Sequence, residues 1–158
     1  MIIRNVKVYT QEQKFADGEI VIRDGVFGDS QVVSGVAVVP KDGEEIMDGE
    51  GCYAIPGLID LHFHGCMGYD FCDGTKEAIE EIAKYEASIG VTAIAPATMT
   101  LPVEELEHIL ETAAEYKEEA EKRAKEGSSK EADLIGVNME GPFISKVKKG
   151  AQDEKNII

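Results

Sequence analysis

The chain is poor in basic residues. It holds 16 Lys and Arg against 31 Asp and Glu among 158 residues, which gives a formal net charge of −15 at pH 7. Binding to nucleic-acid phosphates requires clustered Lys and Arg, so this balance excludes a simple nucleic-acid binder. With 43% hydrophobic residues, the chain is also too apolar for a disordered acidic tail. We therefore expect a packed core.

The chain also lacks long apolar runs. No stretch approaches the roughly 18 consecutive apolar residues of a membrane span. Residues 1–5 have neither the basic region nor the apolar stretch that opens a signal peptide. We expect a cytoplasmic protein with no membrane partner.

Cysteine is scarce. Cys52, Cys66 and Cys72 are an odd number of thiols without a Cys-x-x-Cys spacing, which argues against a disulfide framework. Free cysteine is among the most buried residue types. We expect three buried thiols.

Residues 1–52 alternate short β-branched runs with Asp-Gly pairs. Asp-Gly supplies the positive φ of tight hairpin turns, so this region is predicted to be a small antiparallel β unit. Such a unit has little core of its own. The expected strands lie at 2–3, 6–9, 19–23 and 36–39.

From residue 53 the pattern becomes strand, helix, strand, helix, strand. This order is typical of parallel βαβ units and predicts the α/β class. Thr75 can cap the first helix, Gly90 can end it, and Pro102 suits the first turn of the second. The charged half of the second helix, 115–126, is expected to face solvent. The expected strands are 54–61, buried on both faces, 91–99 and 134–139, and the expected helices are 76–89 and 100 or 101 to 127.

Inward-facing apolar residues are expected on both helices. The first helix has Ile79, Ile82, Ala83 and the pair 85–86 in helical spacing. The second is expected to bury Val103, Leu106, Ile109, Leu110 and Ala113.

Two histidines follow the first of these strands. His62 and His64 are two residues apart, so on a strand both side chains point to the same side. The carboxyl ends of strands in α/β sheets and barrels face the active site. The pair is therefore either a metal-binding pair or two histidines satisfied within the core.

A carboxylate follows the third strand. Glu140 precedes Gly141-Pro142, where it must point into the mouth of a site or find a buried partner. The alternative is an ion-paired loop residue. Two imidazoles and a carboxylate match the ligands of a hydrolytic zinc or similar divalent ion, and this favours a metal site formed by His62, His64 and Glu140.

These pieces resemble the N-acetylglucosamine-6-phosphate deacetylase family of the amidohydrolase superfamily. The pattern at 55–65 is shared with hydantoinase-like and dihydroorotase-like enzymes, whereas Glu-Gly-Pro-Phe and Lys-Gly-Ala-Gln are much narrower. The resemblance covers essentially the whole chain and is carried by residues 55–65, 90–92, 96–98, 140–144 and 149–152.

The resemblance implies a metal-dependent (β/α)₈ TIM-type barrel preceded by a small β-sandwich-like domain. Residues 1–52 would be the N-terminal part of the small domain, and 53–158 the first three βα units of the barrel. The implied reaction is hydrolysis of N-acetylglucosamine 6-phosphate to glucosamine 6-phosphate and acetate in cytoplasmic amino-sugar catabolism. It implies one or two divalent ions per subunit, zinc or iron, and a homo-oligomer.

The resemblance also implies roles for single residues. Glu140 would bind the principal metal, and His62 and His64 the second metal of two-metal members. Ala151 aligns with a position that touches the sugar, and Gln152 stands beside it where many relatives have histidine. His108, on the surface of an expected helix, is not expected to touch metal.

The catalytic aspartate and the remaining metal and phosphate ligands of the family would come from later strands, past Ile158. A complete barrel takes about 250 residues. An open three-stranded sheet would leave an unpaired edge and apolar surface exposed. We expect no catalytic residue in this chain and no activity from it alone. The alternatives are another amide hydrolase of the superfamily and a non-catalytic metal-binding or assembly fragment.

Overall fold

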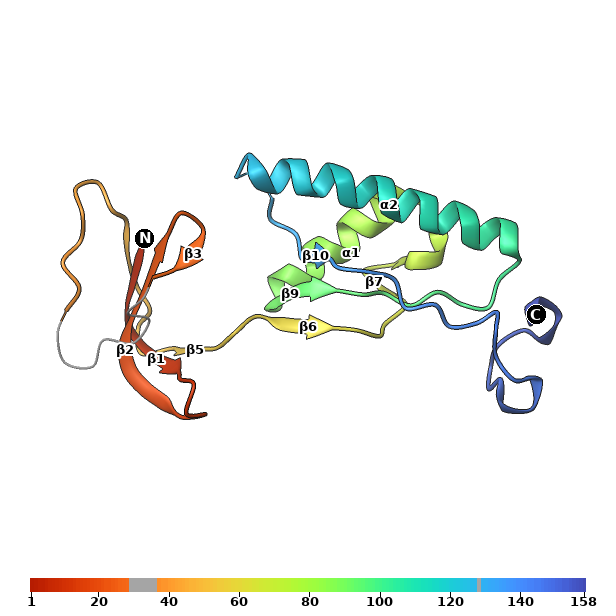
Figure 1. Cartoon of the computed structure of the whole chain (residues 1–158), viewed down its shortest axis with the longest axis horizontal. Helices are drawn as coiled ribbons and strands as arrows, with labels where there is room; N and C mark the ends of the chain where they lie inside the picture. The colour runs from red at the N-terminus through yellow and green to blue at the C-terminus, as the bar shows by residue number, and fades with distance from the viewer. Residues whose placement is uncertain (29–36, 128) are drawn as a thin grey trace. The chain divides into compact units, whose positions relative to one another are not determined.

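The computed structural model describes residues 1–28, 37–127 and 129–158 (Figure 1). These residues form two compact units, Met1–Pro56 and Gly57–Ile158. No helix in the described part of the chain is long and apolar enough to cross a membrane.

The first unit is a sheet of mixed direction. β2 (Phe15–Arg23) pairs antiparallel with β1 (Ile2–Tyr9) and with β3 (Val26–Phe27). β4 (Ile46–Asp48) and β5 (Tyr53–Ala54) pair parallel with β1. The expected antiparallel pairing is thus confirmed for β1 to β3 and wrong for β4 and β5. The physical reason is the connection from β3 to β4, which is far longer than a hairpin turn and lets the chain return in the direction of β1.

The Asp-Gly pairs do not all act as turns. Asp24 and Gly25 have φ values of 54° and 74° and connect β2 to β3, as predicted for a tight hairpin. Asp17-Gly18 lies inside β2 instead, where it pairs with residues of β1. The prediction of a turn there was wrong because cross-strand pairing with β1 continues through both residues.

The expected strand at 36–39 is also wrong where the structure describes it. Residues 37–39 lie in no strand, and Val36 is outside the described residues. The backbone of Val38 forms hydrogen bonds with side chains and not with a neighbouring strand. The Val38 carbonyl accepts a hydrogen bond from Arg4 Nη2 at 2.6 Å, and the Val38 N–H donates to Glu19 Oε2 at 2.8 Å.

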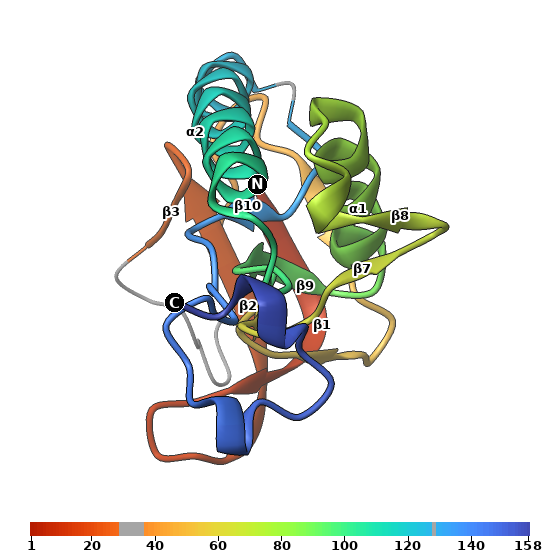
Figure 2. The same ribbon diagram turned by 90° about the vertical axis from the view of Figure 1, so that its right-hand side faces the viewer.

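The second unit contains the predicted parallel βαβ arrangement. Its sheet has the order β10 (Asp133–Leu134), β9 (Val91–Ile94), β6 (Leu58–Asp60), with both pairs parallel. α1 (Lys76–Ser88) connects β6 to β9, and α2 (Val103–Lys125) connects β9 to β10. Both helices lie on the same side of this sheet (Figures 1 and 2).

A short hairpin follows β6 and was not predicted. β7 (Gly65–Cys66) and β8 (Tyr69–Asp70) pair antiparallel and lie beside α1 (Figure 2). The two turn residues, Met67 and Gly68, have φ values of 58° and 87°. Position 67 is Met, whereas such a turn usually has Asn or Asp there, so the sequence signal for this hairpin was weak. Three short 3₁₀ helices complete the described part of the unit: η1 (Phe71–Asp73), η2 (Lys146–Lys148) and η3 (Glu154–Asn156).

The helix ends follow local sequence closely. The Thr75 side chain caps α1 by accepting a hydrogen bond from the Ala78 N–H at 3.2 Å, and Gly90, at φ 93°, follows the helix end. α2 begins at Val103, not at Thr100 or Leu101 as expected. Thr100 cannot join the helix because its backbone N–H and carbonyl are bonded to Gln152 and Asn156.

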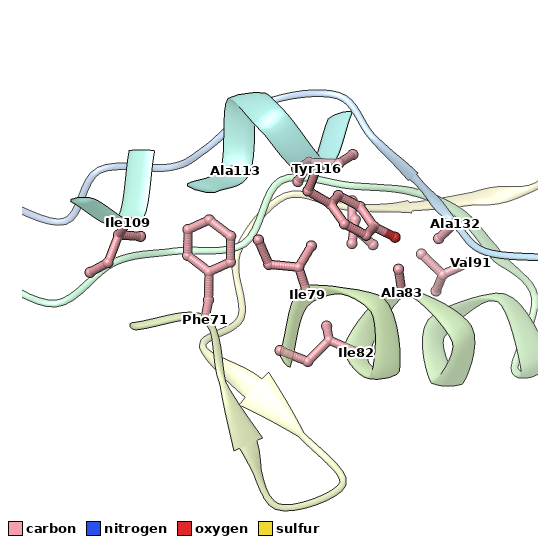
Figure 3. Packing of buried hydrophobic residues seen from close by; sticks show 11 residues of the cluster. Phe71, Ile79, Ile82, Ala83, Val91, Ile109, Ala113, Tyr116 and Ala132 are labelled. Atoms are coloured by element: carbon pink, nitrogen blue, oxygen red, sulfur yellow. The ribbon is translucent and has the colours of Figure 1, made fainter. Parts of the chain in front are cut away.

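The core of the second unit lies between the two helices and the sheet (Figure 3). Burial of the predicted residues is confirmed except for Tyr85 and Val103, which are exposed, and Leu110, which is half-buried. Tyr116 is 1% exposed although it lies in the half of α2 expected to face solvent. Its hydroxyl donates to Glu131 Oε2 at 2.7 Å, which satisfies the polar end of a buried ring. The buried cluster is Phe71, Ile79, Ile82, Ala83, Val91, Ile94, Ile109, Ala113, Tyr116, Ala132 and Leu134.

β6 is not the doubly buried strand that its composition predicted. Leu58, Ile59 and Leu61 are each more than half exposed. Within the described residues β6 is an edge strand that pairs only with β9. The exposed apolar surface predicted for an open three-stranded sheet is confirmed.

The cysteines are free, but they are not uniformly buried. Cys52 is exposed, which corrects the prediction, and Cys66 and Cys72 are half-buried. Cys52 is exposed because it lies immediately before the two-residue strand β5, in a unit with little core. Cys72 Sγ accepts a hydrogen bond from the Met99 N–H at 3.2 Å.

Candidate metal centre

The segments that follow β6, β9 and β10 remain side by side beyond the strands. The Ala97 N–H donates to the Phe63 carbonyl at 2.7 Å, and the Thr98 N–H donates to the Asn138 carbonyl at 3.0 Å. The regular strands are shorter than the expected 91–99 and 134–139, because Pro96 has no N–H to donate and interrupts the ladder. The two segments nevertheless stay paired up to Thr98 and Asn138. These segments bring residues 62–64 and Glu140 to one edge of the sheet.

The structure brings together the three residues predicted to bind metal. Nε2 of His64 lies 3.4 Å from Glu140 Oε2, and Nε2 of His62 lies 3.7 Å from the same oxygen. One ligand atom from each residue lies within 4.8 Å of the other two. The side chains are 35 to 55% exposed, so an ion could enter from solvent. His108 lies on the exposed surface of α2, outside this group.

This donor set fits a divalent cation. Imidazole nitrogen with carboxylate oxygen is zinc chemistry, and three protein ligands leave a fourth position for water or substrate. Two ligands of one tetrahedral zinc, each about 2.0 Å from the ion, lie about 3.3 Å apart. The His64–Glu140 separation of 3.4 Å agrees with this value, and the His62–Glu140 separation is slightly longer.

Neighbouring residues position His62. Asp60 Oδ1 accepts a hydrogen bond from the His62 N–H at 3.0 Å. Asn138 Nδ2 lies 2.9 Å from the Leu61 carbonyl oxygen and 3.1 Å from His62 Nδ1. Sequence reasoning missed Asn138, although it lies two residues before Glu140, and in an extended segment that spacing places both side chains on one side.

Thr100 was also missed, and it supports Glu140. Its hydroxyl donates to the Glu140 backbone carbonyl at 2.9 Å. No local motif marks this contact, because the two residues are 40 positions apart.

The two residues predicted to bind sugar differ in exposure. Ala151 is exposed, whereas Gln152 is 4% exposed. Gln152 Oε1 accepts a hydrogen bond from the Thr100 N–H at 2.7 Å, and its Nε2 faces Met99 Sδ at 3.8 Å. The Gln152 side chain therefore joins the C-terminal segment to the segment after β9. Sugar binding by either residue stays a prediction.

A buried acid lies on α1, the helix behind the sheet. Glu86 is 6% exposed. Burial raises the pKa of its carboxyl group, and the negative charge of Asp60 raises that pKa further.

The chain has relatives among known proteins. No protein-family model matches the chain. The N-acetylglucosamine-6-phosphate deacetylase of Bacillus subtilis (strain 168) is 28% identical over 158 residues, which cover 98% of this chain and 37% of that protein. The chain resembles the N-terminal part of N-acetylglucosamine-6-phosphate deacetylases.

Two further deacetylases of this name support the likeness. That of Vibrio furnissii is 34% identical over 97 residues, covering 61% of this chain and 22% of that protein. The crystal structure of the Thermotoga maritima deacetylase superposes with a TM-score of 0.69 at 30% identity, covering 99% of this chain and 36% of that one. The chain thus spans less than two fifths of each relative. The resemblance stated from sequence motifs is confirmed.

Proposed function

We propose that these 158 residues form the N-terminal part of an N-acetylglucosamine-6-phosphate deacetylase. The complete enzyme would hydrolyse the acetamide of N-acetylglucosamine 6-phosphate to glucosamine 6-phosphate and acetate, in cytoplasmic amino-sugar catabolism. One observation carries the proposal. His62, His64 and Glu140 meet beyond the carboxyl ends of parallel strands, in a chain that matches a deacetylase of this name over 98% of its length.

The second unit would be the first three βα units of a (β/α)₈ barrel. Its strands are parallel, and each helix connects neighbouring strands, which is the repeating arrangement of that barrel. The exposed edge strand β6 offers a place where a further strand could pair. The first unit would contribute to a small β domain. We place the boundary at Pro56, where the two compact units divide, a few residues after the position 52 expected from sequence.

Each residue of the candidate centre has a proposed task. Glu140 would hold the principal metal, and His62 and His64 would hold the second or share the first. A divalent cation such as zinc would polarise the acetyl carbonyl and make water more acidic. Asp60 orients the His62 backbone, and Thr100 holds the Glu140 backbone in place. Proton transfer to the leaving amine would need a carboxylate from outside these residues.

Acetate release tests this proposal. The assay compares the 158-residue chain with the polypeptide isolated from its natural source, each with Zn²⁺ and N-acetylglucosamine 6-phosphate. We expect a natural polypeptide heavier than 17.2 kDa that releases acetate, and no release from the short chain. Release by the 17.2 kDa chain would overturn the view that its site is incomplete.

Substrate comparison separates this function from its alternatives. The natural polypeptide is assayed with N-acetylgalactosamine 6-phosphate, with unphosphorylated N-acetylglucosamine and with a cyclic amide. Preference for a cyclic amide would transfer the proposal to another amide hydrolase of the superfamily. Stoichiometric metal without hydrolysis of any of these amides would favour a non-catalytic metal-binding protein.

A further inference from the structure

The side-chain nitrogen of Asn138 lies within hydrogen-bond distance of two atoms, one from Leu61 and one from His62. This atom, Nδ2, lies 2.9 Å from the Leu61 carbonyl oxygen and 3.1 Å from His62 Nδ1. A carbonyl oxygen can only accept a hydrogen bond, so the amide atom that faces Leu61 must be the nitrogen. Turning the amide over would place two oxygens against each other. The Leu61 carbonyl therefore sets the orientation of Asn138, and His62 Nδ1 faces a donor.

This orientation decides the tautomer of His62. A neutral imidazole has one nitrogen with hydrogen and one with a free lone pair. Since Nδ1 accepts from Asn138, the ring hydrogen is on Nε2, which is the nitrogen that faces Glu140 at 3.7 Å. A metal ion on that side requires the Nε2 lone pair. Histidine ligands normally donate their other N–H to a carboxylate, a carbonyl or water, and Asn138 presents the opposite polarity.

His64 is under no such constraint. Its Nδ1 is buried and has no hydrogen-bond partner among the described residues. No side chain there imposes a tautomer, so Nε2 is free to present its lone pair. This nitrogen is also the nearer of the two to Glu140, at 3.4 Å. The two histidines, alike in sequence, are therefore unequal as ligands.

We propose that Asn138 is a positioning residue that disfavours the His62 tautomer able to bind metal through Nε2, so that His62 is a weaker ligand than His64. His62 binds an ion only by giving up its hydrogen bond from Asn138, whereas His64 loses no such bond. The inference rests on the metal centre of the proposed function and concerns the relative strength of its ligands. Asn138 thereby lowers the affinity of the centre for a divalent ion.

A double-mutant cycle on the 158-residue chain tests the coupling, with Zn²⁺ affinity measured by competition with a chromophoric chelator. We expect H62A to change the affinity of the original chain by less than about 3-fold, and N138L to increase it by about 10-fold, within the range known for residues that contact metal ligands. In the N138L chain, H62A should then weaken binding by about 10-fold. H64A should weaken binding in both backgrounds, and H108A, on the surface of α2, should leave it unchanged. If H62A and H64A weaken the original chain equally, or if N138L weakens it, the proposal is wrong.

The tautomer can be observed without metal. Nitrogen NMR of the metal-free chain at about pH 8 distinguishes a neutral ring with hydrogen on Nε2 from one with hydrogen on Nδ1. We expect the Nε2 form for His62 and a shift toward the Nδ1 form in N138L. The Nδ1 form in the original chain would contradict the inference. A chain that binds no zinc yet has the expected tautomer would instead count against the proposed metal centre, so the two failures are distinguishable.

Discussion

The hydroxyl group of Thr100 donates a hydrogen bond to the backbone carbonyl of Glu140 at 2.9 Å. Thr100 is 2% exposed, and its own N–H and carbonyl are bonded to Gln152 and Asn156. A side chain added to Gly141 would collide with this hydroxyl group. One buried threonine thus joins the segment after β9 to both the candidate metal ligand and the C-terminal segment.

Replacing Thr100 by valine removes this hydroxyl group with little change of shape. We expect T100V to lose about 1 kcal/mol of unfolding free energy, the usual net value of one hydrogen bond, and to weaken Zn²⁺ binding because Glu140 is less well held. Urea unfolding followed by circular dichroism measures the first effect. The matched control is T92V, since Thr92 is exposed and its hydroxyl donates over a longer 3.4 Å. Equal stability losses in the two variants would contradict the role of Thr100.

Gln152 provides a second test of the same region. In Q152A the Thr100 N–H loses its acceptor in a buried place, and we expect a loss of about 1–3 kcal/mol in unfolding free energy. Q11A is the control, because Gln11 is exposed in the first unit. A Q152A chain as stable as the original would show that water replaces the side chain.

Removal of the Glu140 carboxylate charge should weaken the metal centre. We expect E140Q to lower Zn²⁺ affinity by at least about 10-fold, since an amide is a poorer zinc ligand than a carboxylate. The rise in unfolding temperature that Zn²⁺ causes, a mass-action effect, should shrink accordingly and disappear with chelator. E107Q is the control, because Glu107 lies beside His108 on the exposed face of α2. Unchanged zinc stabilisation in E140Q would exclude Glu140 as a ligand.

The first unit should lose stability in acid through Glu44. Its carboxylate accepts two hydrogen bonds from Arg23, at 2.8 and 3.0 Å, and one from the Lys41 N–H at 2.9 Å. The Arg23 hydrogen bonds, followed by that from Lys41, lower the pKa of Glu44 from 4.5 to about 2. A lowered folded-state pKa stabilises the fold above the unfolded-state value, and this contribution is lost as pH falls from about 4.5 toward 2.

The measurement compares the unfolding temperatures of the original chain and E44Q across this range. We expect the original chain to be more stable at pH 7 and the difference to shrink below about pH 4.5 and vanish below about pH 2, where Glu44 is protonated in the folded chain as well. E45Q, which changes an exposed neighbour, should show a much smaller difference at every pH. A gap between the original chain and E44Q that is constant with pH would mean that the ion pair with Arg23 contributes nothing.

Local sequence determined much of this protein. The cap at Thr75, the helix end at Gly90 and the order of strands and helices depend on residues within a few positions of one another, so each could be predicted without the fold. The meeting of His62, His64 and Glu140 was also predictable, because side chains that follow neighbouring parallel strands lie at one edge of a sheet.

Tertiary structure alone decided the remainder. The parallel direction of β4 and β5 follows from their pairing with β1. The Tyr116 ring can be buried because its hydroxyl donates a hydrogen bond to the Glu131 carboxylate. The bonds of Thr100 to Glu140 and to Gln152, and that of Asn138 to His62, join residues 40, 52 and 76 positions apart. Polar side chains such as these are compatible with solvent or with many partners, and no local period indicates which one they will meet. Only the packing of distant segments brings one donor against one acceptor.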